Sequence, residues 1–129
     1  MALLGPNGAG KTTTRLTLSG LLAPIAGRIE VLGSSIGGVR PHLLPRRGLA
    51  HVPEDRSLFY DLTVERLLPI EGDIADQTGC GVLIVEQHVH MALDIADRGC
   101  VLSSGTVRLE GSARDLASNR SLLEETYLG

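Results

Sequence analysis

The sequence has 129 residues, which suits one domain and leaves little room for a second. Apolar residues make up 43% of the chain, which excludes disorder throughout, and aromatic residues only 2%, so the core must consist of Leu, Ile, Val and Ala. The formal net charge of −3 argues against nucleic acid as a partner. No apolar run is long enough to span a membrane, so we expect a cytoplasmic protein.

The first half of the chain alternates short apolar runs with turn-forming residues. Ala2–Leu4 is predicted to be a buried strand that leads into a glycine-rich loop, and Lys11–Ser19 is predicted to be a helix. Apolar and charged residues alternate over Gly27–Leu32, which predicts a half-buried strand. Leu49–Val52 is predicted to be another strand, closed by Pro53.

The second half continues the alternation. A short helix is predicted over Val64–Leu68, and Ile70–Thr78 has weak helical character. The nearly continuous β-branched run Gly81–Val85 is typical of a strand covered on both faces. A helix is expected over His88–Ala96. A hairpin is expected next, with strands Gly99–Leu102 and Thr106–Leu109 around the turn Ser104-Gly105. A helical tail over Ala113–Leu128 follows. Strands that alternate with helices predict an α/β domain with a mainly parallel sheet.

The loop after the first strand carries the strongest chemical signal. It matches G-x-x-x-x-G-K-[ST] and lies between a predicted strand and a predicted helix, as a P-loop requires. Glycines let backbone N–H groups turn toward one anion, the helix N-terminus adds its positive dipole end, and a lysine supplies charge. The residues expected to bind nucleotide phosphates are Gly5, Pro6, Asn7, Gly8, Ala9, Gly10, Lys11, Thr12 and Thr13. The Thr12 hydroxyl is the expected Mg²⁺ ligand.

Further blocks of the sequence resemble the ATP-binding subunits of ABC transporters. The spelling GPNGAGKTTT, from Gly5 to Thr14, resembles their Walker A motif. Val52–Phe59 looks like the Q-loop region of the branched-chain amino acid importers, with Glu54 where most of the family has Gln. Val85–His88 and Ala92–Arg98 are similar to the switch strand and following helix of the same group, and Gln87 falls at the switch position.

The resemblance implies a P-loop NTPase-type sheet flanked by helices, with a C-terminal β-hairpin and helical tail, as a truncated ABC ATPase core. Residues 1–129 would then form a single, partial ATP-binding domain. The implied cofactors are ATP and Mg²⁺, with Glu54 and Gln87 near the phosphates. The implied partners are a second ATP-binding subunit and transmembrane permease subunits, at the inner face of the cell membrane. The implied function is branched-chain amino acid import coupled to ATP hydrolysis.

Parts of the family pattern have no counterpart in this sequence. These are the N-terminal sheet with its adenine-stacking aromatic residue, an LSGGQ-like signature, and an apolar run ending in Asp-Glu, the Walker B motif. The stretch from Glu54 to Gln87 is too short for a helical subdomain and a Walker B strand together. We therefore expect impaired hydrolysis. A non-enzymatic remnant that binds nucleotide weakly or not at all is the alternative, and another P-loop enzyme, such as a small-molecule kinase, is a third.

Two further groups of residues invite a chemical interpretation. Glu86 ends an apolar run as a Walker B carboxylate would, but a carboxylate at a strand end near the phosphate site is the interpretation we favour. His88 and His90, with Cys80 nearby, suggest a metal site; their spacing would place the two histidines on different faces of a helix. Cys80 and Cys100 are expected to be buried free thiols in a reducing compartment.

Overall fold

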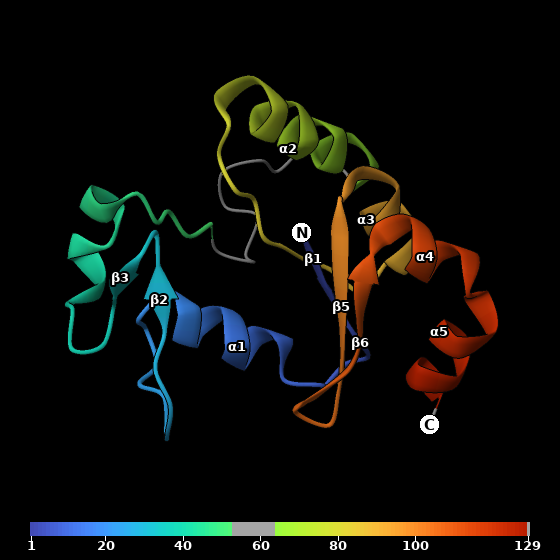
Figure 1. Ribbon diagram of the computed structural model, residues 1–129, viewed down its shortest axis with the longest axis horizontal. Coiled ribbons are helices and arrows are strands. Elements are labelled where there is room, and N and C mark those ends of the chain that lie inside the picture. Colours follow the sequence, from blue (N-terminus) through green and yellow to red (C-terminus); the bar gives the residue numbers. More distant parts are fainter. Residues whose placement is uncertain (53–63, 129) are drawn as a thin grey trace. The chain divides into compact units, whose positions relative to one another are not determined.

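The computed structural model describes residues 1–52 and 64–128 of the chain (Figure 1). The chain divides into two compact units. The first unit comprises Met1–Lys11 and Asp61–Gly129, and the second comprises Thr12–Tyr60. In the part of the chain that is described, no helix has both the length and the apolar character needed to cross a membrane.

A four-stranded sheet forms the centre of the first unit. Its strands lie in the order β4 (Ile84–Val85), β1 (Ala2–Leu4), β5 (Arg98–Ser103) and β6 (Thr106–Ser112). β1 pairs parallel with both β4 and β5, and β6 pairs antiparallel with β5. The predicted α/β fold with a mainly parallel sheet is confirmed. So is the predicted hairpin, whose two-residue turn is Ser104-Gly105.

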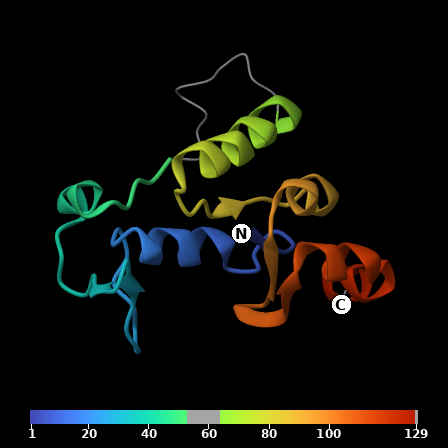
Figure 2. The same ribbon diagram turned by 45° about the horizontal axis from the view of Figure 1, so that its top comes forward.

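The alternation of side chains along the central strands places apolar residues on both faces of the sheet. On one face, Leu4 and Val101 are fully buried. They pack with residues of α3 (Val89–Ile95), α4 (Ala113–Ser118) and α5 (Arg120–Leu128), which Figures 1 and 2 show grouped on one side of the sheet. The other face carries a smaller cluster of Leu3, Ala9, Cys100 and Leu102. β1, the strand that precedes the glycine loop, thus pairs with a strand on each side and packs against apolar side chains on both faces.

Two elements of the first unit differ in extent from the prediction. α2 runs without a break from Val64 to Thr78, where the sequence predicted a short helix over Val64–Leu68 and only weak helical character over Ile70–Thr78. It ends before Gly79, whose φ of +66° is typical of the residue that follows a helix. The strand predicted over Gly81–Val85 is shorter, and the expectation that it is covered on both faces is wrong. β4 is an outer strand of the described sheet, and Leu83 is 40% exposed.

The second unit contains the rest of α1 (Lys11–Leu18), the two-stranded antiparallel sheet of β2 (Glu30–Val31) and β3 (Ser34–Ser35), and two short 3₁₀ helices, Pro41–Leu43 and Pro45–Arg47. The predicted helix is confirmed to within one residue, and the predicted strand over Gly27–Leu32 shrinks to β2.

The strand predicted over Leu49–Val52 is wrong. A strand needs a neighbouring strand for its backbone groups, whereas the Leu49 N–H donates locally, to the Leu44 carbonyl at 3.1 Å. The His51 side chain contacts a residue far away in sequence, since its Nδ1 lies 2.5 Å from Ser19 Oγ.

Candidate functional site

The glycine loop begins at Gly5, directly after β1. Gly5 is buried and has a φ of +150°, and a Cβ atom at this position would lie 2.3 Å from the carbonyl oxygen of Leu102. No other residue fits this combination of backbone angle and close approach. The first glycine of the predicted P-loop is therefore required by the packing of the loop against β5.

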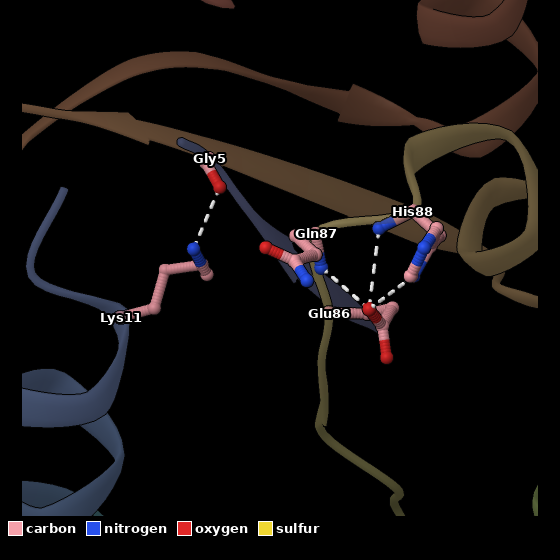
Figure 3. Close-up of polar contacts among 5 residues, drawn as sticks. All are labelled: Gly5, Lys11, Glu86, Gln87 and His88. Carbon is pink, nitrogen blue, oxygen red and sulfur yellow. Dashed lines mark hydrogen bonds and ion pairs between the residues drawn. The ribbon is translucent and has the colours of Figure 1, made fainter. Parts of the chain in front are cut away.

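Lys11 folds back over the loop that precedes it. Its Nζ donates hydrogen bonds to the carbonyl oxygens of Gly5 at 2.6 Å and Pro6 at 3.0 Å (Figure 3). The Ala9 N–H also donates to the Pro6 carbonyl, at 3.2 Å, so the loop turns tightly. The ammonium group is half-buried beside the backbone of Gly5. A positive charge is thereby held within a curved, glycine-rich backbone, an arrangement suited to an anion.

The remaining predicted loop residues differ in exposure and backbone conformation. Asn7 and Gly8 are exposed at the tip of the loop, whereas Ala9 is only 2% exposed and packs in the smaller apolar cluster. Gly8 and Gly10 have φ values of +79° and +98°, which other residues rarely adopt. Thr12 and Thr13 are exposed in the first turn of α1. Glu54, the predicted Q-loop residue, lies outside the described residues.

Gln87 lies at the same edge of the sheet as the glycine loop. β1 and β4 are parallel neighbours with Leu3 opposite Val85, and the Glu86 N–H donates to the Leu3 carbonyl at 3.2 Å. The residues that follow the two strands must therefore meet at one edge. Figure 3 shows the Gln87 side chain extending toward Lys11, while the Glu86 carboxylate turns toward His88. The structure thus brings Gln87, the residue predicted at the switch position, toward the lysine, but not the Glu86 carboxylate.

Glu86 Oε1 accepts three hydrogen bonds from its neighbours in sequence. The donors are the backbone N–H of Gln87 at 2.8 Å, the backbone N–H of His88 at 3.2 Å and Nδ1 of His88 at 2.8 Å. Burial favours the neutral carboxyl and raises the pKa of Glu86, but the bonds from Gln87 and His88 outweigh it, and the pKa lies below its ordinary value. The ionised carboxylate braces the connection between β4 and α3.

His88, His90 and the two cysteines lie in different surroundings. His88 precedes the first residue of α3, and His90 lies within α3. Cys80 is exposed, so the expectation that it is buried is wrong. Within residues 1–52 and 64–128, no group of three or more His, Cys, Asp or Glu side chains could hold a metal ion. Cys100 is buried, and burial, followed by the charge of Glu110, raises the pKa of its thiol.

The β5–β6 turn is a neighbour of the loop that the sequence did not reveal. The Gly105 N–H donates to the Ala9 carbonyl at 2.9 Å, and a Cβ on Gly10 would lie 3.5 Å from the Gly105 Cα. The turn itself could be found from its Ser-Gly spelling between two apolar runs. Its contact with the glycine loop could not, because about a hundred residues separate the two in sequence.

A parallel strand, a glycine loop with a lysine folded over it, and a helix that starts at that lysine define the class of P-loop proteins. A family model described as "ABC transporter" matches residues 1–123, and the chain belongs to this family.

Similar curated proteins include the lipopolysaccharide export system ATP-binding protein LptB of Haemophilus influenzae, which is 36% identical over 138 residues. The match covers all of this chain and 56% of that protein. The high-affinity branched-chain amino acid transport ATP-binding protein BraG of Pseudomonas aeruginosa is 31% identical over 134 residues, covering all of this chain and 58% of that protein. The chain thus spans somewhat more than half the length of these relatives.

Solved structures with the same fold include CbiO1 of Clostridium perfringens, part of the CbiONQ ABC transporter complex. It matches with a TM-score of 0.71 at 14% identity, over 96% of this chain and 81% of that one. A nucleotide-free ATP-binding cassette from an ABC transporter matches with a TM-score of 0.70 at 16% identity, over 95% of this chain and 85% of that one. At these identities the likeness concerns the fold.

Proposed function

We propose that the chain is the ATP-binding part of an ABC transporter and that Gly5–Thr13 bind the phosphates of Mg²⁺-ATP. The observation that carries the proposal is the Lys11 ammonium held beside the Gly5 and Pro6 carbonyls at the start of α1. The loop fits this ligand because Gly5, Gly8 and Gly10 have positive φ values, the backbone conformations that allow N–H groups to turn toward an anion. The exposed Thr12 hydroxyl would ligate Mg²⁺, and Mg²⁺ would neutralise phosphate charge.

Competition titrations with ATP, GTP and tripolyphosphate test this proposal. The phosphate-binding donors are local to the loop, whereas no adenine-stacking aromatic residue is assigned in the sequence. We therefore expect weak binding that depends on the phosphates and discriminates poorly between adenine and guanine. A stacked base contributes about 1–3 kcal/mol, so tight and adenine-selective binding would mean that another residue of this chain holds the base. Binding that survives Lys11→Ala unchanged would contradict the assignment of the loop.

The same proposal assigns the carboxyl end of β4 to the switch. Gln87 would sense the phosphates, and Glu86 would hold Gln87 in place. Support comes from the three hydrogen bonds that Glu86 Oε1 accepts from its own neighbours. A carboxylate committed in this way is a poor general base for water, which argues against Glu86 as a Walker B substitute.

Since the family model spans both compact units, residues 1–129 are proposed to act as one ATP-binding domain, with Glu54 near the phosphates.

Hydrolysis by this chain is proposed to be impaired, with a non-enzymatic nucleotide-binding role as the alternative. No apolar run ending in Asp-Glu and no LSGGQ-like stretch occurs in the 129 residues. Phosphoryl transfer depends on positioned charge around the γ-phosphate. ATP turnover should therefore equal that of Lys11→Ala in a sensitive phosphate-release assay. Turnover that both Lys11→Ala and Glu86→Gln abolish would instead place Glu86 in the catalytic position.

The partners proposed are a second ATP-binding subunit and transmembrane permease subunits, at the inner face of the membrane. Branched-chain amino acid import is the transport role favoured by the spelling of Val85–His88 and Ala92–Arg98. Lipopolysaccharide export is the second candidate, because proteins named LptB are 34–36% identical to this chain. Co-purification of tagged chain with its permease decides between them. A permease required for leucine uptake supports the first role, and one required for lipopolysaccharide export supports the second.

A further inference from the structure

The β5–β6 hairpin touches the glycine loop at three points. The Leu102 carbonyl oxygen lies so close to Gly5 that a Cβ there would be 2.3 Å away. The Gly105 N–H donates to the Ala9 carbonyl at 2.9 Å, and the Gly105 Cα lies 3.5 Å from where a Cβ on Gly10 would be. All of these residues belong to the first unit. One strand and one turn therefore support the loop near its start and near its end.

The β5–β6 ladder does not use the Gly105 N–H, which can therefore make this contact. Ser103 lies opposite Thr106 in the ladder, so Ser104 and Gly105 form a two-residue turn, and both have positive φ values, +49° and +76°. The strand ladder uses the backbone groups of the residues that flank such a turn, not the N–H of its second residue. The Gly105 N–H can point out of the hairpin, and it bonds the loop.

Ala9 and Gly10 share one peptide unit, which links this bond to the anion site. A trans peptide unit is planar, with its C=O and N–H pointing in opposite directions. A donor that holds the Ala9 carbonyl therefore also sets the direction of the Gly10 N–H. Backbone N–H groups of this loop are the donors proposed above for the phosphates.

We infer that Gly105 is a positioning residue for phosphate binding, because its N–H holds the Ala9 carbonyl and so orients the Gly10 N–H. This inference rests on the proposed function and assigns a residue that the P-loop motif does not contain. The hairpin turn thus supports the loop from the side opposite the proposed anion. By linkage, an anion that favours this orientation of Gly10 also strengthens the bond from Gly105 to Ala9.

The test compares the same substitution in two turns of the same type. Gly105→Pro removes the N–H, whereas Gly105→Asn keeps it and tolerates positive φ. Gly33→Pro is the matched control, since Leu32 and Gly33 form another two-residue turn with positive φ, in the second unit. Tripolyphosphate is the probe because it reports the phosphate contacts alone. We expect Gly105→Pro to weaken its binding about tenfold or more, and the other two variants to stay within about twofold.

Amide hydrogen exchange on the unaltered chain supplies a second measurement that requires no variant to fold. Saturating tripolyphosphate should slow exchange of the Gly105 amide and leave that of the Gly33 amide unchanged. Equal affinity of Gly105→Pro and the unaltered chain, an equal loss in Gly33→Pro, or unchanged Gly105 exchange would each overturn the inference alone. An unaltered chain that melts cooperatively and binds neither ATP nor tripolyphosphate would overturn the proposed function as well.

Discussion

The hairpins β2–β3 and β5–β6 each turn through two residues with positive φ, Leu32 with Gly33 and Ser104 with Gly105. Beyond the turn they differ. β2 and β3 have two residues each and no buried side chain, whereas β5 has six residues, four of them buried in a row. β5 also pairs with β1 along its other edge. Turn chemistry therefore decides where a hairpin forms, whereas burial and a neighbouring strand decide how far its ladder extends.

The largest expected effect tests this difference in burial. Val101 in β5 is fully buried, whereas Val31 in β2 is only half-buried. Val101→Ala should lower the free energy of unfolding by about 2 kcal/mol or more, from lost apolar burial and the cavity left behind. Val31→Ala should cost less than about 1 kcal/mol. Urea unfolding curves of both variants measure the difference, and equal losses would mean that the two hairpins are equally anchored.

The next effect separates phosphate binding from the stability of the second unit. Lys11→Ala should weaken tripolyphosphate binding about tenfold to a hundredfold, because a charge-assisted contact of about 1.5–3 kcal/mol is lost. Val31→Ala serves as the control and should leave the affinity unchanged, since the Lys11 contacts lie within the first unit. Isothermal titration gives both affinities. A comparable loss in the two variants would show that phosphate binding depends on β2 and β3.

A smaller effect depends on pH and compares two glutamates. Since hydrogen bonds lower the pKa of Glu86 in the folded chain, its carboxylate stabilises the fold above the unfolded pKa. That contribution is lost as the pH falls through the folded pKa. Glu86→Ala should cost about 1 kcal/mol at pH 7, in keeping with the net value of a hydrogen bond, and little at pH 2. Glu30 forms an exposed pair with Arg28 at 3.3 Å, and Glu30→Ala should change stability by less than about 0.5 kcal/mol at either pH.

Unfolding midpoints at the two pH values measure the Glu86 effect. A Glu86→Ala cost that is the same at pH 7 and pH 2 would contradict the role of the ionised carboxylate.

The smallest effect concerns the first residue of each turn. Leu32 has a φ of +50° and is 77% exposed, and the left-handed region is unfavourable for leucine. Leu32→Asn should stabilise the chain by about 0.5–1 kcal/mol, because Asn-Gly is the preferred spelling of such a turn. Ser104→Asn should gain less, since serine already has a short polar side chain. A loss of stability in Leu32→Asn, read from the melting temperature, would mean that leucine makes a contact worth more than the strain.

The sequence by itself determined the glycine loop, the helix that starts at Lys11 and the hairpin around Ser104-Gly105. These features depend on backbone angles and local spacing, so residues near in sequence suffice to predict them. It also predicted Gln87 beside the phosphates, from the resemblance at Val85–His88. Leu49–Val52 and Gly81–Val85 have the composition of strands, yet the first forms none and the second is reduced to β4.

Only the tertiary structure decided which strands pair and what supports the loop. Strand length depends on partners that lie far away along the chain, because backbone groups need a neighbour to bond. The approach of Leu102 to Gly5 and the bond from Gly105 to Ala9 both arise where the sheet brings distant segments together. No local pattern encodes such contacts, since they follow from the register of β1 between β4 and β5.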